Sequence, residues 1–543
     1  MKVSHAFKRV CLAIAIASAA ASATAQTTYV QGPSTGSTPY LKATSSRVTK
    51  VTSILTVDNT GSNPDDSIGG YGMVGIPDGL GAFDNEDGTF TVLMNHELRD
   101  TAGAVRAHGS KGAFVSKWVI NKSDLSVASG GDLIQKVYGW DTTTQANATT
   151  DATVAFNRFC SADLANQTAF YNAATGLGTQ EKIFLTGEEG GTNGFVAATV
   201  VTGASAGNSY ILGKFNLSQN GSGVNDWGGW ENVVASPFAQ DKTVVIGPND
   251  GGDGIMSQSV AVYVGTKTNT GSVVDRAGLN NGTLGFVTVA GNPTEIVNST
   301  IVNSTTRATN ITDGTRFSIS DTASTAFSRP EDGAWNPMNP SEFWFVTTDR
   351  LDTLSDGVGS QIGQTRLWKL AFDDITDPSL GGSIDLVLDG PTVNGQKVNM
   401  FDNMGFNETT GTIILQEDVG GTAHNSKVWE YDPKTDRLTQ LLMHDSSRFG
   451  DLGVSRTSPY SNDEESSGVI DVTSFFVSDP NERRYNQYYL VTDQAHYTTG
   501  ITTAQVEGGQ LLLIQAVPEP GTTTLLCIGA GLLGVGRLRR RKA

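Results

Sequence analysis

The chain is long and acidic, with 543 residues, 37 Lys and Arg against 55 Asp and Glu, and a formal net charge of −18 at pH 7. A surface of this sign repels nucleic acid and anionic lipid, so we expect neither of them as a partner. Clustered carboxylates, by contrast, suit hard cations such as calcium.

The N-terminus has the pattern of a secretory signal peptide. Basic residues precede an apolar run over residues 10–20, and the small residues 23–25 (ATA) follow it. The run is too short for a membrane span, and a buried helix is the alternative. We therefore expect residues 1–25 to be a cleavable signal and residues 26–50 to be an exposed leader.

Residues 51–516 are expected to form one all-β domain. The 63 glycines of the chain and many short β-rich runs separated by Gly, Asn, Asp and Thr favour strands and turns over helices. A β-propeller accommodates this length because it grows by adding blades around one axis. The sequence therefore predicts a β-propeller with a central metal-binding channel.

A loose theme recurs in this domain, in which a short apolar strand ends in an acidic or amide cluster. Unpaired buried charge is costly, so such ends need partners. In a propeller the inner strands line the channel, where these ends would form a ring of oxygen ligands; ordinary polar turns are the alternative. The instances are residues 89–97 (TFTVLMNHE), 183–189 (IFLTGEE), 243–250 (TVVIGPND), 342–349 (EFWFVTTD), 412–418 (TIILQED) and 487–493 (QYYLVTD).

Cys160 stands alone in the predicted mature protein, because Cys11 lies in the expected signal and Cys527 in the C-terminal tail. A lone cysteine cannot form an internal disulfide. Three uses remain open for it: a buried inert thiol, a bond between chains, or a metal ligand or nucleophile.

The C-terminal residues 517–543 have a pattern of their own. Residues 517–520 (VPEP) precede an apolar stretch over residues 522–535, and a basic cluster follows. This arrangement resembles the PEP-CTERM sorting signal of Gram-negative bacteria, which implies export, recognition by the sorting machinery, removal of the tail, and delivery to the outer-membrane surface or beyond. The stretch of about 15 residues is marginal for a bilayer that needs about 20, so we expect only a transient transmembrane helix. A plain C-terminal anchor is the alternative.

Five groups of motifs occur in order between roughly residues 50 and 515. They are 75–82 (GIPDGLGA) with 93–97 (LMNHE) and 112–118 (GAFVSKW), 158–161 (RFCS) with 187–190 (GEEG), 327–333 (FSRPEDG), 401–406 (FDNMGF) with 415–418 (LQED), and 463–468 (DEESSG) with 506–510 (VEGGQ). Together they resemble the PhoX-like alkaline phosphatase family. Its best characterised branch is a propeller phosphomonoesterase with iron and calcium at its centre, one iron being bound by a cysteine.

Carried over position by position, the resemblance implies a set of site residues. Cys160 would bind iron, Glu188 or Glu189 or both would bind the metal cluster, and Glu331 would add a carboxylate. Arg329 would bind phosphate and take part in catalysis. Taken alone, Arg329 could instead form a surface ion pair and the paired glutamates a solvated turn. The further metal ligands that the resemblance implies are Glu97, Asp402, Glu417 and Asp418.

The residue types suit this chemistry without the family. A thiolate with carboxylates suits iron, whereas carboxylate and amide oxygens suit calcium. Closely spaced metals can clamp both the attacking and the leaving oxygen of a phosphoryl displacement, and an arginine adds a bidentate donor. Because bound cations neutralise the ligand carboxylates, the site can attract an anion although the whole chain is acidic.

The expected function is that of an exported metal-dependent phosphomonoesterase, which scavenges phosphate from a small phosphorylated substrate. The alternative is a non-catalytic protein of the cell surface or extracellular matrix in which calcium only rigidifies the propeller. Hydrolysis of a different ester, such as a phosphodiester or phytate, is the third hypothesis.

Overall fold

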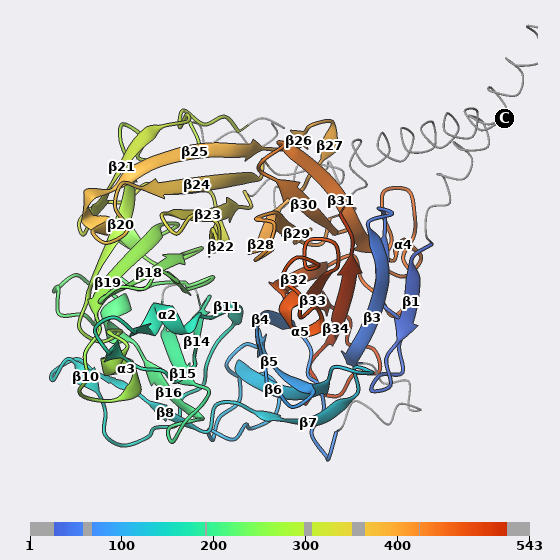
Figure 1. Cartoon of the computed structure of the whole chain (residues 1–543), viewed down its shortest axis with the longest axis horizontal. Helices are drawn as coiled ribbons and strands as arrows, with labels where there is room; N and C mark the ends of the chain where they lie inside the picture. Colours follow the sequence, from blue (N-terminus) through green and yellow to red (C-terminus); the bar gives the residue numbers. More distant parts are fainter. Residues whose placement is uncertain are drawn as a thin grey trace, which may run out of the picture.

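The protein is a β-propeller. A computed structural model describes residues 26–57, 68–190, 193–297, 307–349, 364–422 and 424–518. Within these ranges the chain forms twisted sheets that surround a central axis (Figure 1). The predicted all-β propeller is thereby confirmed. The expected signal and most of the expected sorting tail lie outside the described residues.

The described strands form six blades, two of which are joined edge to edge in a nine-stranded sheet through β21 and β25. In blades 1, 3 and 4 the chain runs outward from the axis, strand by strand, and in blade 2 it does so from β11 to β16, while the earlier strand β8 adds to the outer edge. Blade 1 contains β4 (Pro77–Asp84), β5 (Thr89–His96), β6 (Phe114–Asn121) and β7 (Val127–Asp132); blade 2 contains β11 (Phe159–Leu164), β14 (Ile183–Glu188), β15 (Val196–Val200), β16 (Asn208–Ile211) and β8 (Lys136–Tyr138); blade 3 contains β17 (Val234–Ala235), β18 (Lys242–Pro248), β19 (Val260–Thr266), β20 (Thr283–Val289) and β21 (Thr315–Ser320); blade 4 contains β22 (Pro330–Trp335), β23 (Glu342–Thr347), β24 (Arg366–Phe372) and β25 (Gly382–Asp389).

The last two blades combine strands from both ends of the described chain. In blade 6 the N-terminal strand β3 pairs antiparallel with the C-terminal strand β34, which closes the ring. Blade 5 contains β28 (Phe401–Phe406), β29 (Ile413–Glu417), β30 (Lys427–Asp432), β31 (Arg437–His444) and β2 (Leu41–Ala43); blade 6 contains β32 (Glu464–Asp471), β33 (Gln487–Ala495), β34 (Gly508–Ala516), β3 (Val48–Val57) and β1 (Thr28–Gln31).

Residues 26–50, which were expected to be an exposed leader, contribute strands to two blades, although three of the four β1 residues are exposed. Strand β1 pairs in parallel with β3, and β2 pairs with the outer strand β31 of blade 5. Tyr40 and Leu41 are fully buried. The segment is held because its backbone completes the hydrogen bonding of two outer blade edges, which would otherwise stay unpaired.

Short elements occupy the connections between strands, most of them within one blade. They are the one-turn helices α2 (Gln167–Phe170), α3 (Val273–Arg276), α4 (Ser446–Phe449) and α5 (Thr473–Phe476), the 3-10 turns η2 (Gly213–Phe215), η3 (Gly254–Met256) and η5 (Pro378–Leu380), and the strand pairs β9 (Trp140–Asp141) with β10 (Ala146–Asn147), β12 (Tyr171–Asn172) with β13 (Leu177–Gly178), and β26 (Thr392–Val393) with β27 (Gln396–Lys397). Among the described residues no helix is long and apolar enough to cross a membrane. The stretch over residues 522–535, for which a transient transmembrane helix was expected, lies outside them.

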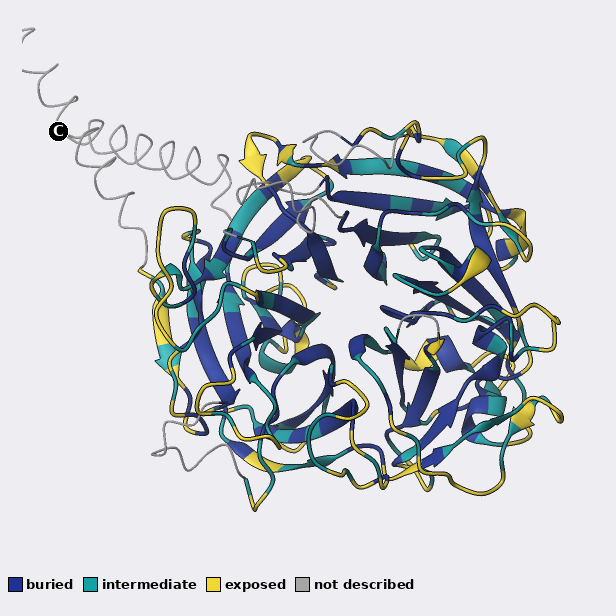
Figure 2. Ribbon diagram, turned by 180° about the vertical axis from the view of Figure 1, so that it is seen from behind, coloured by how far each residue is buried: buried dark blue, intermediate teal, exposed yellow. Residues whose placement is uncertain are grey.

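The core consists of hydrophobic layers between neighbouring blades. Alternate residues of a strand serve opposite layers, as in β14, where Phe184 packs toward blade 1 while Ile183 and Leu185 pack toward blade 3. The last layer joins Leu511 of blade 6 to Val92 of blade 1 and so completes the circle. Figure 2 shows buried residues along the blades and exposed residues mainly in the outer loops. This packing fixes the innermost strands around the axis.

Candidate metal centre

The innermost strands of four blades begin in the same unusual way. Ile76, Arg158, Arg329 and Met400 precede β4, β11, β22 and β28 with φ angles of 50°, 51°, 57° and 49°. Residues other than glycine rarely adopt such angles, and they persist where the surrounding structure enforces them. The pairing with the second strand then shifts in register, as it does at a β-bulge that re-aims side chains. The first residues within these shifts are Asp78, Cys160, Glu331 and Asp402.

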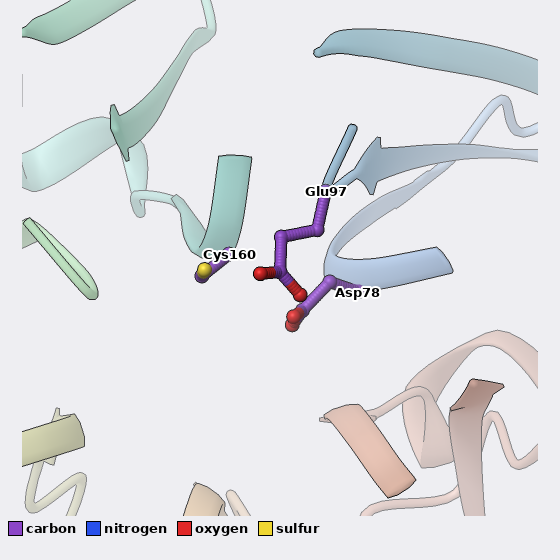
Figure 3. A group of neighbouring side chains, drawn as sticks. All are labelled: Asp78, Glu97 and Cys160. Atoms are coloured by element: carbon purple, nitrogen blue, oxygen red, sulfur yellow. The ribbon is translucent and has the colours of Figure 1, made fainter. Parts of the chain in front are cut away.

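Seven side chains around the axis form one group, which we call the central cluster. Three overlapping sets of three residues have potential ligand atoms that all lie within 4.8 Å of one another. Cys160 and Glu231 each belong to two sets and so make the cluster continuous. In Figure 3, Asp78, Glu97 and Cys160 point toward one another from β4, the end of β5 and β11. The central cluster comprises Asp78, Glu97, Cys160, Glu189, Glu231, Glu331 and Asp402.

The acidic strand ends of the sequence theme belong to the second strand of each blade, not to the innermost strand as expected. Because the second strand pairs with the innermost one, the residues that follow it can still lie beside the axis. Glu97 follows β5 and Glu189 follows β14, and both are members of the central cluster. The other ends are Asp250, which pairs with Arg329, Asp418, whose charge interacts with that of Arg329, and Asp349 and Asp493, which pair with Arg307 and His444.

Burial raises the pKa values of the cluster carboxyls. The pKa of Glu189 rises to about 8 and that of Glu231 to about 7, in both cases chiefly because water is excluded. The pKa values of Asp78, Glu331 and Asp402 rise well above the usual range for the same reason, and neighbouring carboxylates add to the effect. A buried group of acids with so few counter-charges is unfavourable by itself, whereas bound cations would reverse this electrostatic balance.

Two arginines balance part of the acidic charge. The Nη2 atom of Arg158 lies 2.6 Å from Glu97 Oε1, and the same side chain pairs with Glu189. The Nη2 atom of Arg329 lies 3.0 Å from Glu331 Oε1. The buried Oδ1 atom of Asp250 nevertheless has no hydrogen-bond partner within the described ranges. A buried polar atom left without a partner indicates that a ligand, such as a cation, completes the site.

The donor set fits the two metals expected from the sequence. Cys160, Glu189 and Glu231 offer a sulfur and two carboxylates, a combination that suits iron. Glu231, Glu331 and Asp402 offer oxygen atoms only, which suits calcium. Burial and the nearby carboxylates raise the pKa of the Cys160 thiol. A bound cation would therefore be needed to displace the thiol proton.

A polar layer lies directly beneath the central cluster. Ser161 donates a hydrogen bond to Glu231 Oε1 at 2.8 Å, and Asn403 Nδ2 donates to Ser161 Oγ at 2.7 Å. Ser161 and Asn403 also line a pocket of about 580 Å³ on the axis, which we call the funnel. Asp163 and Asp332 are among its lining residues. The axis therefore has two distinct parts, the acidic cluster and the funnel, separated by one layer of side chains.

Three of the predicted ligands, Glu188, Glu417 and Asp418, lie outside the central cluster. The first two are hydrogen-bonded to other groups of the protein. Glu188 accepts hydrogen bonds from the backbone N–H groups of Asn157 and Phe195 at 2.7 and 2.8 Å. Glu417 accepts from two backbone N–H groups and, at 2.8 Å, from Trp429 Nε1. Both carboxylates are thus already engaged by the protein. The structure brings together Cys160, Glu189, Glu97, Glu331 and Asp402, with Arg329 beside Glu331.

The sequence analysis missed two members of the central cluster, Asp78 and Glu231. Asp78 lies inside a motif that had been noted, residues 75–82, but it was not singled out. Glu231 precedes Asn232 just before β17, and the same pairing of an acidic with a polar residue begins β22 and β28. This recurring doublet at the start of the innermost strands was the available signal.

Comparisons with solved structures return distant similarities. The periplasmic gluconolactonase PpgL of Pseudomonas aeruginosa is 10% identical, with a TM-score of 0.32 over 81% of this chain and 89% of its own. The catalytic domain of the GH62 α-L-arabinofuranosidase of Coprinopsis cinerea is 11% identical, with a TM-score of 0.30 over 62% and 86%. A subtype N10 neuraminidase-like protein of A/little yellow-shouldered bat/Guatemala/060/2010 is 6% identical, with a TM-score of 0.32 over 82% of this chain and 95% of its own.

Sequence comparison is informative at the C-terminus. No curated protein matches the chain. The family model of the PEP-CTERM protein-sorting motif matches residues 516–542, so this part of the expectation is confirmed. The motif indicates export and membrane-associated sorting to the cell surface through the sorting machinery. The chain is therefore a β-propeller that carries a PEP-CTERM sorting motif at its C-terminal end.

Proposed function

We propose that the protein is an exported, metal-dependent hydrolase of phosphate monoesters that scavenges phosphate from a small substrate. The central cluster carries this proposal, because it joins one thiol and six carboxyl groups within ligand distance on the propeller axis. Buried carboxylates that serve only the fold are normally paired with hydrogen-bond donors or positive charges, and they do not gather in this way. The resemblance to PhoX-like phosphatases adds support from the motifs around the same residues.

The chain would divide the work between metal binding and substrate binding. Cys160, Glu189 and Glu231 would hold iron, and Glu231, Glu331 and Asp402 would hold calcium. When bound, these metals supply Lewis-acid stabilisation of the charge that develops on phosphoryl oxygens. Arg329 would orient the substrate phosphate through its guanidinium group. The hydrogen bonds from Ser161 would hold Glu231 in position as a ligand.

Hydrolysis of p-nitrophenyl phosphate tests the proposal. The purified protein, loaded with iron and calcium, is expected to release p-nitrophenol and to lose this activity when a chelator removes the metals. The matched control is Arg316→Gln, which alters an exposed arginine paired with Asp373 and should leave activity unchanged. A fully metal-loaded protein without activity on phosphate monoesters would show that the catalytic assignment is wrong.

The oxygen-only set within the central cluster favours a second candidate, a surface protein that binds calcium without catalysis. Elemental analysis separates the two functions, since the enzyme should contain iron as well as calcium. Cys160→Ser sharpens the test because it removes the sulfur ligand but leaves Glu231, Glu331 and Asp402 intact. The enzyme proposal expects this variant to lose iron and activity while it keeps calcium.

A further inference from the structure

Two arginines occupy equivalent positions in different blades. Arg158 and Arg329 each lie two residues before a member of the central cluster, Cys160 or Glu331, and each has a left-handed φ angle. The equivalent positions in two other blades hold the apolar residues Ile76 and Met400, with the same backbone conformation. The turn therefore does not require arginine. The positive charge of the two arginines is therefore not explained by the backbone conformation alone.

The arginines lie nearer to solvent than the acids with which they pair. The Arg158 side chain is 33% exposed, against 10% for Glu97 and 13% for Glu189. The Arg329 side chain is 19% exposed, against 2% for Glu331. A ligand that approaches the cluster from this side meets two guanidinium groups before it meets the carboxylates. Two positive charges thus lie on the solvent side of the acids with which they pair, where they can attract an anion.

Each guanidinium group keeps donor capacity for a ligand. Arg158 uses Nε and Nη2 toward Glu97 and Nη2 toward Glu189. Arg329 uses Nε toward Asp250 and Nη2 toward Glu331. In the described part of the chain neither Nη1 atom donates a hydrogen bond. A guanidinium group has five N–H donors, so both side chains can bind an anion without leaving their carboxylates.

The two arginines flank one continuous part of the cluster. Cys160 and Glu231 have ligand atoms within 4.8 Å of each other, as do Glu231 and Glu331. Arg158 stands two residues before the first of these three ligands, and Arg329 two residues before the last. The Arg158 guanidinium group pairs with Glu189 and that of Arg329 with Glu331, and each of these acids has a ligand atom within 4.8 Å of one of Glu231. An anion bound over Glu231 would therefore lie between the two guanidinium groups.

We propose that Arg158 is a second anion-binding residue, which acts with Arg329 to select a doubly charged phosphate monoester over a singly charged diester. The inference rests on the proposed function and names the substrate class of the same site. A monoester dianion has three terminal oxygens, enough to contact the metals and both arginines, whereas a diester has only two. Arginine is suited to this role because its planar donors match oxyanion geometry and keep their charge at every physiological pH.

Calorimetric titration of the metal-loaded protein tests this role without relying on turnover. The probes are inorganic phosphate, which resembles the dianion, and dimethyl phosphate, which resembles the diester. Arg158→Gln is expected to weaken phosphate binding about 10- to 100-fold, the usual effect of losing hydrogen bonds to a charged group, and to weaken dimethyl phosphate binding much less. Arg316→Gln is the control and should change neither affinity. Elemental analysis of every sample establishes equal metal content.

The outcomes separate this inference from the proposed function. If the wild-type protein with full metal content does not bind phosphate, the proposed function and the inference both fail. If the wild type binds phosphate and Arg158→Gln binds it equally well, the proposed function stands and the role of Arg158 is refuted. If Arg158→Gln loses affinity equally for phosphate and for dimethyl phosphate, the selectivity for the dianion is refuted. Should Arg158→Gln lose its metals, Arg158→Lys replaces it, because lysine can still pair with Glu97. Lysine keeps the charge but lacks the planar pair of donors, so the loss of phosphate affinity in that variant should be smaller than in Arg158→Gln; an affinity equal to that of the wild type would show that the guanidinium group of Arg158 does not hold the anion.

Discussion

The two parts of the propeller axis treat buried carboxylates in opposite ways. At the funnel, Asp332 accepts hydrogen bonds from Asn232 Nδ2, Gly333 N and Met404 N at 2.5, 2.6 and 3.0 Å. In the central cluster the adjacent residue Glu331 has one oxygen that makes no hydrogen bond, although Arg329 lies 3.0 Å away. These two neighbouring acids on β22 thus differ in the origin of their hydrogen-bond partners. The fold itself supplies donors to Asp332, whereas Glu331 is arranged for a partner that the chain does not provide.

Removal of the metals tests this contrast with the largest expected effect. An ion present at about 1,000 times its Kd stabilises the folded state by about 4 kcal/mol, so chelation should lower the free energy of unfolding by a similar amount for each ion lost. The metal-free protein should also become less stable as the pH rises from about 5 to 8. Folded Glu231 and Glu189 keep their protons up to pH values of about 7 and 8, whereas the unfolded chain releases them near the usual pKa of 4.5.

Urea denaturation at pH 5 and pH 8, with and without a chelator, measures both effects. The metal-loaded protein serves as the control, because bound cations remove the cost of ionising the cluster and should abolish this loss of stability. A chelated protein that is as stable at pH 8 as at pH 5 would mean that the cluster carboxyls are satisfied without cations.

Substitutions of Glu331 and Asp332 test the same difference between the central cluster and the funnel, and we expect a smaller effect than that of metal removal. Glu331→Gln removes a cluster carboxylate and should weaken metal binding by about 100-fold or more, since changes even in outer partners of metal ligands cost 10- to 100-fold. Asp332→Asn should leave the metals bound and lower the free energy of unfolding by about 1–3 kcal/mol, because three donors lose their charged acceptor. Metal titration and urea denaturation of both variants check this. The same loss of metal in both would show that the two acids form a single site.

The sequence predicted the fold better than it predicted membership of the cluster. The β-rich runs and the propeller followed from local patterns, and the acidic strand ends correctly indicated that charge gathers near the axis. Glu188 and Glu189 could not be told apart, because one residue along a strand moves the side chain to the other side. Only the tertiary structure shows that Glu188 accepts hydrogen bonds from two backbone N–H groups while Glu189 lies beside Cys160. The register shifts that aim Asp78 inward likewise depend on tertiary pairing.

The funnel offers the smallest expected effect, through Asp163. Its Oδ2 atom accepts a hydrogen bond from the backbone N–H of Ala235 at 2.8 Å, and burial raises its pKa to about 7. Since the unfolded chain releases this proton near pH 3.8, Asp163 should reduce stability progressively as the pH rises through 7. Asn at this position keeps an oxygen acceptor but carries no charge to bury. Asp163→Asn should therefore leave the metals in place and, by urea denaturation, gain stability relative to the wild type between pH 6 and pH 8. If Asp163→Asn lost metal, the funnel would contribute to metal binding, and the two parts of the axis would not be distinct.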